Sequence, residues 1–129
     1  MKKLLLATAA GALIAGAAGA EEIKIGISLG LTGPLESIAP PIQKGAELAM
    51  TQVSDSGKLL DGSTVVPVVA DNTCIDAAAS VAAVERLVTS DHVKGIVGGM
   101  CSGETIASLE KVGVPNGVVS TAIRTSSPA

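Results

Sequence analysis

The residues of this chain that are best suited to chemistry lie in one short segment, residues 99–105. An expected strand ends in Gly98 and Gly99 at the beginning of this segment, and Cys101, Ser102 and Gly103 begin an expected helix. Free backbone N–H groups at a helix start attract anions, and the helix dipole adds to this attraction. Ser102 adds a hydroxyl, and Gly103 lets a ligand approach the backbone, so the segment is suited to binding a carboxylate. The alternative is that Cys101 or Ser102 only caps the helix, with Glu104 completing the capping interaction.

The same segment also fits a template for a nucleophile. Residues 99–103 read G-x-C-x-G, a cysteine version of the nucleophile elbow, in a strand-turn-helix context. A thiol nucleophile needs a base to activate it. The single histidine, His92, precedes Cys101, whereas the hydrolase order places the histidine after the nucleophile. A cysteine-dependent hydrolase is therefore the weaker interpretation, and we expect no enzyme.

Other kinds of functional site find no support in the sequence. It contains neither a P-loop nor a G-x-G-x-x-G motif, and no cluster of His, Cys, Asp or Glu has the spacing of a metal site. We therefore expect no cofactor and no metal. Asp71 and Asp76 flank Cys74, and loop carboxylates beside a helix start are typically caps. Acidic residues outnumber basic ones by twelve to nine, which argues against a nucleic-acid partner, since phosphate binding needs a basic patch.

The beginning of the chain has the parts of a secretory signal peptide. Lys2 and Lys3 give a short positive start, residues 4–18 are apolar and small, and Ala18-Gly19-Ala20 is a small-x-small cleavage signal. We therefore expect residues 1–20 to be removed by cleavage after Ala20, which leaves 109 residues with a net charge of −5. An uncleaved membrane anchor is the alternative, but the apolar stretch is short for a span of roughly 20 residues.

Export also bears on Cys74 and Cys101, the only two cysteines. In an oxidising compartment an even count favours a disulfide, and two free buried thiols are the alternative. Closing the loop between them would stabilise the fold by roughly 3.5 kcal/mol on the chain-entropy model. Because the chain has no Phe, Tyr or Trp, its core must be built from Val, Ile, Leu, Ala and Met, and we expect that core to be thin.

The hydrophobic pattern predicts strands that alternate with helices along the chain. Strands are expected at residues 23–29, 63–70, 93–98 and 118–122, and helices at residues 41–53, 75–89 and 102–112. Strands joined by helical crossovers form a parallel sheet with helices on both faces, so the expected fold class is α/β with a doubly wound sheet. Ligands of such sheets bind at the carboxyl ends of the strands, where the Gly-rich and Ser/Thr-rich segments of this chain fall.

Five segments, in order along the chain, resemble the Leu/Ile/Val-binding proteins, which are type I periplasmic solute-binding proteins of ABC importers. The segments are residues 23–26 with 31–35, 44–49, 71–76, 97–105 and 114–119. The resemblance covers about residues 22–119 and implies the type I periplasmic binding protein fold. Members of that family close two lobes around the ligand, so residues 21–129 are expected to form part of the N-terminal lobe only.

The resemblance also implies a set of site residues. Cys74 and Cys101 would form a disulfide. Ser102 and the backbone around it, including Gly103, would hold the α-carboxylate and α-amino groups of an amino acid. The further ligand-lining residues are Leu35 and Ile38, in the loop that borders the side-chain pocket, and Thr125 or Ser126, which would supply a hydroxyl. Arg124 is foreign to the family pattern in this last segment.

The function implied by the resemblance is the capture of leucine, isoleucine, valine or a related amino acid in the periplasm and its delivery to an ABC permease in the inner membrane. The second lobe would normally supply further ligand contacts, so we expect residues 21–129 to bind weakly at most. The alternative is a truncated, non-transporting remnant that associates with itself through an open edge of its sheet.

Overall fold

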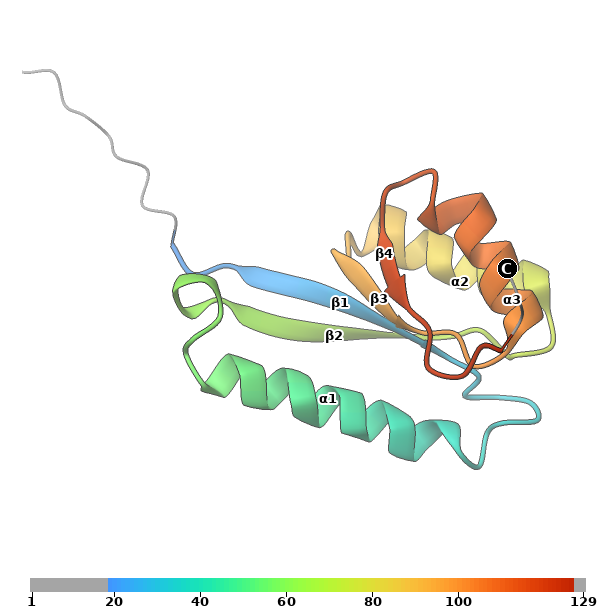
Figure 1. The fold of residues 1–129 in the computed structure, drawn as a ribbon, viewed down its shortest axis with the longest axis horizontal. Helices are drawn as coiled ribbons and strands as arrows, with labels where there is room; N and C mark the ends of the chain where they lie inside the picture. The colour runs from blue at the N-terminus through green and yellow to red at the C-terminus, as the bar shows by residue number, and fades with distance from the viewer. Residues whose placement is uncertain (1–18, 127–129) are drawn as a thin grey trace, which may run out of the picture.

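The computed structural model describes residues 19–126. Most of the predicted signal peptide, residues 1–20, lies outside the described residues. Four parallel strands form one sheet in the order β2-β1-β3-β4. The strands are β1 (Glu22–Leu29), β2 (Thr64–Asp71), β3 (Gly95–Gly98) and β4 (Val119–Thr121). Helices lie on both faces of this sheet, as Figure 1 shows, which confirms the predicted α/β class with a doubly wound parallel sheet.

Helix α1 (Ala39–Asp55) covers one face of the sheet along β1 and β2 (Figure 1). It extends two residues beyond the predicted range at each end. Pro40 and Pro41 lie in its first turn, where a missing N–H group costs no helical hydrogen bond and the fixed φ of proline suits the helix. A buried cluster joins this helix to the sheet and consists of Ile27, Leu29, Ala39, Met50, Cys74 and Met100.

Helices α2 (Ala77–Glu85) and α3 (Ser102–Ser108) cover the other face, and they contact each other. Each continues into a π-helical turn, Arg86–Ser90 after α2 and Leu109–Gly113 after α3. The buried cluster on this side contains Ala70, Val84, Leu87, Val93, Ile96 and Val112. Gly26 of β1 makes room for the fully buried Leu87, since a Cβ there would lie 3.0 Å from a leucine methyl carbon.

The second helix begins two residues later than predicted. Thr73 and Cys74 have left-handed φ values of 57° and 66°, which a helix cannot accommodate. Asp76 then caps α2, because its carboxylate accepts the backbone N–H groups of Ala78 and Ala79 at 2.8 and 3.2 Å. The predicted capping role of Asp76 is therefore confirmed.

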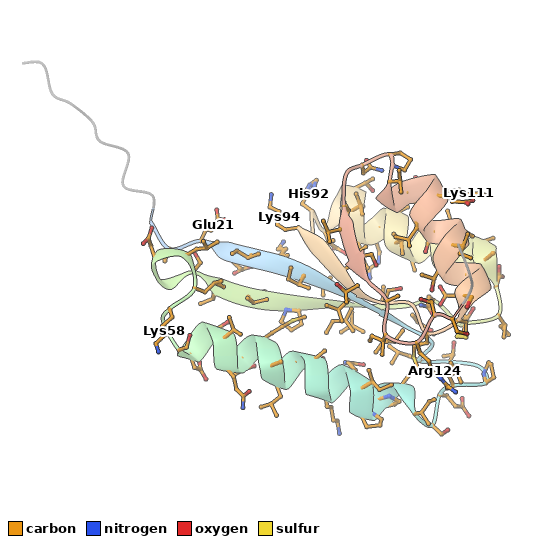
Figure 2. All side chains as sticks on the ribbon, in the orientation of Figure 1. Glu21, Lys58, His92, Lys94, Lys111 and Arg124 are labelled. Atoms are coloured by element: carbon orange, nitrogen blue, oxygen red, sulfur yellow. A yellow bond between two sulfur atoms is a disulfide. The ribbon has the colours of Figure 1, made fainter. Side chains whose placement is uncertain are left out.

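The two ends of the sheet differ in the segments they carry. His92 and Lys94 lie just before β3, whereas Arg124 lies at the opposite end of the sheet (Figure 2). His92 is exposed, as expected for a residue in a polar loop. Within residues 19–126, no helix has both the length and the apolar character needed to cross a membrane.

Candidate ligand-binding site at the carboxyl ends of the strands

The register of the sheet aligns the carboxyl ends of its strands. Leu29, at the end of β1, pairs with Asp71 at the end of β2, and Ser28 pairs with Gly98 at the end of β3. The segments that leave these strands therefore start side by side, as expected for a parallel sheet. They are residues 30–38, 72–76, 99–101 and 122–126.

A disulfide between Cys74 and Cys101 joins two of these segments. Its Cα atoms lie 5.5 Å apart, and it links the turn after β2 to the residue that precedes α3. The pairing implied by the family resemblance is thus confirmed. The disulfide also takes up the Cys101 thiol that a hydrolase mechanism would require.

The last described residues lie against the start of α3. The backbone N–H groups of Ile123 and Arg124 donate to the carbonyl oxygen of Gly99, at 3.2 and 3.4 Å. The N–H group of Ser126 donates to the hydroxyl oxygen of Ser102 at 3.2 Å. Two of the predicted site residues, which are 24 positions apart in the sequence, are therefore in direct contact.

The other predicted site residues lie next to this contact in the sequence or in the loop that leaves β1. Thr125 is half-buried beside Ser126, and Gly103 is exposed in the first turn of α3. Leu35 and Ile38 lie in the loop between β1 and α1, where Leu35 packs against the α1-side core and Ile38 is 39% exposed. Gly30, the first residue of this loop, lies against Cys74, because a Cβ at Gly30 would be only 2.9 Å from the Cβ of Cys74. The disulfide then connects Cys74 to Cys101, the residue before α3.

Asp71 holds the loop between β1 and α1, a role that the sequence did not predict. Its Oδ1 accepts the backbone N–H groups of Leu31, Thr32 and Thr73, at 2.9, 3.3 and 2.9 Å. Its Oδ2 accepts the hydroxyl of Thr32. The expectation that Asp71 caps a helix is wrong, because its carboxylate points back to the β1–α1 loop and Asp76 caps α2 instead.

These hydrogen bonds give the stability of the chain a dependence on pH. Burial raises the pKa of Asp71, but the hydrogen bonds from Thr32, Thr73 and Leu31 to the charged carboxylate outweigh burial, so its pKa is lowered from 3.8. A carboxyl group whose pKa is lower when folded stabilises the fold above its unfolded pKa, and this contribution disappears as pH falls through the folded value. We therefore expect Asp71→Asn to lower the free energy of unfolding at pH 6, and the difference from the wild type to shrink below pH 3.8. Urea denaturation of the wild type and of Asp71→Asn at several pH values measures the two free energies of unfolding. A difference between them that stays constant with pH would contradict this role of Asp71.

Glu104 is a second carboxylate with a structural task, and it is 96% buried. Its Oε1 accepts the backbone N–H of Cys101 at 3.1 Å and the side-chain amide of Asn72 at 3.4 Å, and its Oε2 accepts the hydroxyl of Ser80 at 2.9 Å. The proposed capping interaction between Glu104 and the start of α3 is confirmed. The contacts with Asn72 and Ser80 add to it, so that one side chain ties together the start of α3, the end of β2 and helix α2.

We expect Glu104→Leu to lower the free energy of unfolding by about 2 kcal/mol, because it removes the carboxylate acceptor of the Cys101 N–H group and of the Asn72 side-chain amide. It also leaves the Ser80 hydroxyl with only the backbone carbonyl oxygen of residue 104, at 3.3 Å, as its acceptor. Glu104→Gln is the matched control and should cost about 1 kcal/mol or less. Its amide oxygen can accept from Cys101 and Asn72, and its amide nitrogen can donate to the hydroxyl of Ser80. Chemical denaturation of both variants checks this, and equal losses would contradict it.

The contacts of Asp71 with the β1–α1 loop and of Glu104 with Asn72 and Ser80 could not be predicted from the sequence, for the same reason. Asp71 meets Leu31 across 40 positions, and Glu104 meets Asn72 across 32 positions. The available signal was the place of polar residues directly after a strand or within a first helical turn, where backbone N–H groups need acceptors.

Among the described residues, the structure holds no group of three or more potential metal ligands.

Comparisons with known proteins agree with this architecture. The family model described as periplasmic binding protein matches residues 22–127. The chain is 33% identical to the Leu/Ile/Val-binding protein homolog 7 of Brucella suis, over 89% of this chain and 29% of that protein. It is 30% identical to the Leu/Ile/Val-binding protein homolog 1 of Brucella abortus, over 92% of this chain and 31% of that protein. The chain thus spans less than a third of the length of these relatives.

A solved structure gives the same result for the fold. The branched-chain amino acid transporter substrate-binding protein LivJ of Streptococcus pneumoniae, in complex with isoleucine, superposes with a TM-score of 0.75 at 29% identity. The match covers 84% of this chain and 30% of that structure. The matched family model, the similar sequences and the superposition lead to one conclusion: the chain belongs to the periplasmic binding protein family, with the type I fold of its branched-chain amino-acid-binding members.

Proposed function

We propose that this chain provides one side of the binding site of an ABC importer's substrate-binding protein, and that the ligand is a branched-chain or related aliphatic amino acid. The contact between the N–H group of Ser126 and the hydroxyl oxygen of Ser102 carries this proposal. It gathers hydroxyl and backbone groups from two strand ends at the edge of the sheet where α/β proteins bind ligands. The relatives named as Leu/Ile/Val-binding proteins and the isoleucine complex of LivJ support the ligand class.

The chemistry of these residues suits an α-amino acid. The oxygen of Ser102 accepts the Ser126 N–H, so its own hydrogen can be donated to a ligand carboxylate. The exposed Gly103 leaves room for a ligand at the backbone of α3. Thr125 and Ser126 offer hydroxyl groups for the same ligand, and Leu35 with Ile38 would border its aliphatic side chain. No step in this function makes or breaks a covalent bond.

The remaining parts of the proposal concern export and delivery. Residues 1–20 would act as a signal peptide that is cleaved after Ala20, and residues 21–129 would belong to the N-terminal lobe in the periplasm. The loaded protein would hand its amino acid to an ABC permease in the inner membrane. Mass spectrometry of the exported protein tests the cleavage, since the proposal requires a mature chain that begins at Glu21.

Isothermal titration calorimetry with leucine, isoleucine and valine tests the ligand class. We expect weak binding by the isolated chain, because the two-lobed family closes a second lobe over its ligand. Ser102→Ala should weaken the affinity about tenfold, the usual effect of losing a hydrogen bond to a charged group. Ser90→Ala is the matched control, because Ser90 is exposed at the opposite end of β3 and should leave binding unchanged. Absence of binding at millimolar concentrations of all three amino acids would contradict the proposal.

Self-association is the second candidate function, and an apolar surface favours it. A groove of about 290 Å³ runs between α1 and the sheet, lined by Ala46, Ala49, Met50, Val53, Val65 and Val97. The outer strand β4 also presents Val119, which is 73% exposed. Apolar surface of this kind beside an edge strand promotes contact between chains. A clean monomer by analytical ultracentrifugation at high protein concentration would count against it.

A further inference from the structure

The loop between β1 and α1 is tied to the end of β2 at its second and third residues, Leu31 and Thr32. Leu31 and Thr32 give Asp71 two backbone N–H groups and one hydroxyl. Asp71 also accepts the N–H group of Thr73, so the same carboxylate fixes both sides of the junction. The side chain therefore acts as a clamp between the loop and the turn that leads to the disulfide.

The rest of the loop is connected to this clamp by short local contacts. Gly33 has a φ of 85°, and a Cβ there would lie 2.9 Å from the carbonyl oxygen of Thr73. The N–H of Glu36 donates to Gly33 at 3.2 Å, and the N–H groups of Ile38 and Ala39 both donate to Leu35 at 3.0 Å. These bonds continue directly into α1. A shift of the loop at Thr32 would consequently be passed on to residues 35–38.

The turn on the other side of the clamp needs such support. Thr73 and Cys74 both have left-handed φ values, which cost energy for residues other than glycine. The hydroxyl oxygen of Thr73 is buried and has no hydrogen-bond partner among the described residues. Acceptance of the Thr73 N–H by Asp71 offsets part of this cost, and it holds Cys74 in position for its bond to Cys101.

We propose that Asp71 is a positioning residue that fixes residues 31–38 in one conformation and thereby sets the shape of the aliphatic side of the ligand site. The effect of Asp71 on the conformation of residues 31–38 requires no ligand. The effect on ligand affinity rests on the function proposed above. All four hydrogen bonds of Asp71 go to Leu31, Thr32 and Thr73, so in this proposal the carboxylate acts on the ligand site through the loop.

Amide hydrogen exchange of the free chain tests the positioning role without any ligand. We expect Asp71→Ala to speed exchange at Leu31 and Thr32 at least tenfold, while the amide of Ile27 in β1 keeps its protection. Asp71→Asn should restore most of the protection, since its amide oxygen can still accept the three backbone N–H groups. Asp55→Ala, at the far end of α1, is the control and should leave the loop unchanged.

Two outcomes would overturn the proposal. One is unchanged exchange at Leu31 and Thr32 in Asp71→Ala, and the other is an equal increase at Ile27, which would mean a loss of global stability only. Titration with leucine then separates the two proposals. Weaker binding by Asp71→Ala that Asp71→Asn rescues supports both of them. A loosened loop in a chain that binds no leucine, even as wild type, supports the positioning role and contradicts the proposed function.

Discussion

Replacing Cys74 and Cys101 together by alanine is expected to lower the free energy of unfolding by about 3.5 kcal/mol, because the disulfide closes a loop with a sequence separation of 27. That loss is large for a chain without aromatic residues, since small domains are stable by only about 5–15 kcal/mol. Urea denaturation of the oxidised wild type and of the double variant measures the difference directly.

The same disulfide joins the turn after β2 to the start of α3, so its removal should also loosen the candidate site. Reducing agent provides the control. It should lower the urea midpoint of the wild type and leave the double variant unchanged. Equal midpoints for the oxidised wild type and the double variant would show that the fold does not depend on this cross-link.

Replacing Gly98 by alanine should lower the free energy of unfolding about as much as the loss of the disulfide. Gly98 has a φ of 139°, and a Cβ there would overlap the carbonyl oxygen of Ser28 in the neighbouring strand. Backbone atoms of a central strand cannot move aside without breaking the ladder. The strain of the φ value, about 1–3 kcal/mol, adds to this overlap. We therefore expect a loss of at least about 3 kcal/mol, with little folded protein at 37 °C.

Gly45 offers a matched comparison within the same chain. It lies inside α1, and a Cβ at this position would meet nothing within 4 Å. Gly45→Ala should raise the free energy of unfolding by about 0.5–1 kcal/mol, because alanine restricts the unfolded chain and favours the helix. Thermal unfolding followed by circular dichroism distinguishes the two variants. A Gly98→Ala protein as stable as the wild type would contradict the packing described for the end of β3.

The order and type of the elements could be predicted from the sequence because each follows from local pattern. Alternation of apolar residues marks β1, and prolines in the first turn mark the start of α1. The start of α2 was misjudged because the left-handed turn at Thr73 and Cys74 depends on distant partners. Asp71 and the disulfide to Cys101 hold that turn, and no local pattern reports such contacts.

Part of the candidate site could also be predicted from the sequence. Residues at strand ends are recognisable from Gly and Ser/Thr next to apolar runs, which indicates Ser102, whereas Ser126 is implied only by the resemblance to the Leu/Ile/Val-binding proteins. The cap that Glu104 forms on α3 could be predicted locally, but the contacts of Asp71 and Glu104 with other segments could not. An Asp or Glu beside a helix start has the same local signature whether it only caps that helix or also reaches another segment. Only the fold distinguishes Asp76, which caps α2, from Asp71, which holds the β1–α1 loop.

The central claim is that the strand ends of this chain form one side of an amino-acid site, and a titration of the isotope-labelled chain with leucine, followed by NMR, tests it most directly. The account predicts backbone shift changes at Ser102, Gly103 and Ser126, with smaller changes around Leu35 in the loop before α1. Changes confined to the apolar groove lined by Met50, Val53 and Val97, or no changes at millimolar leucine, would contradict it.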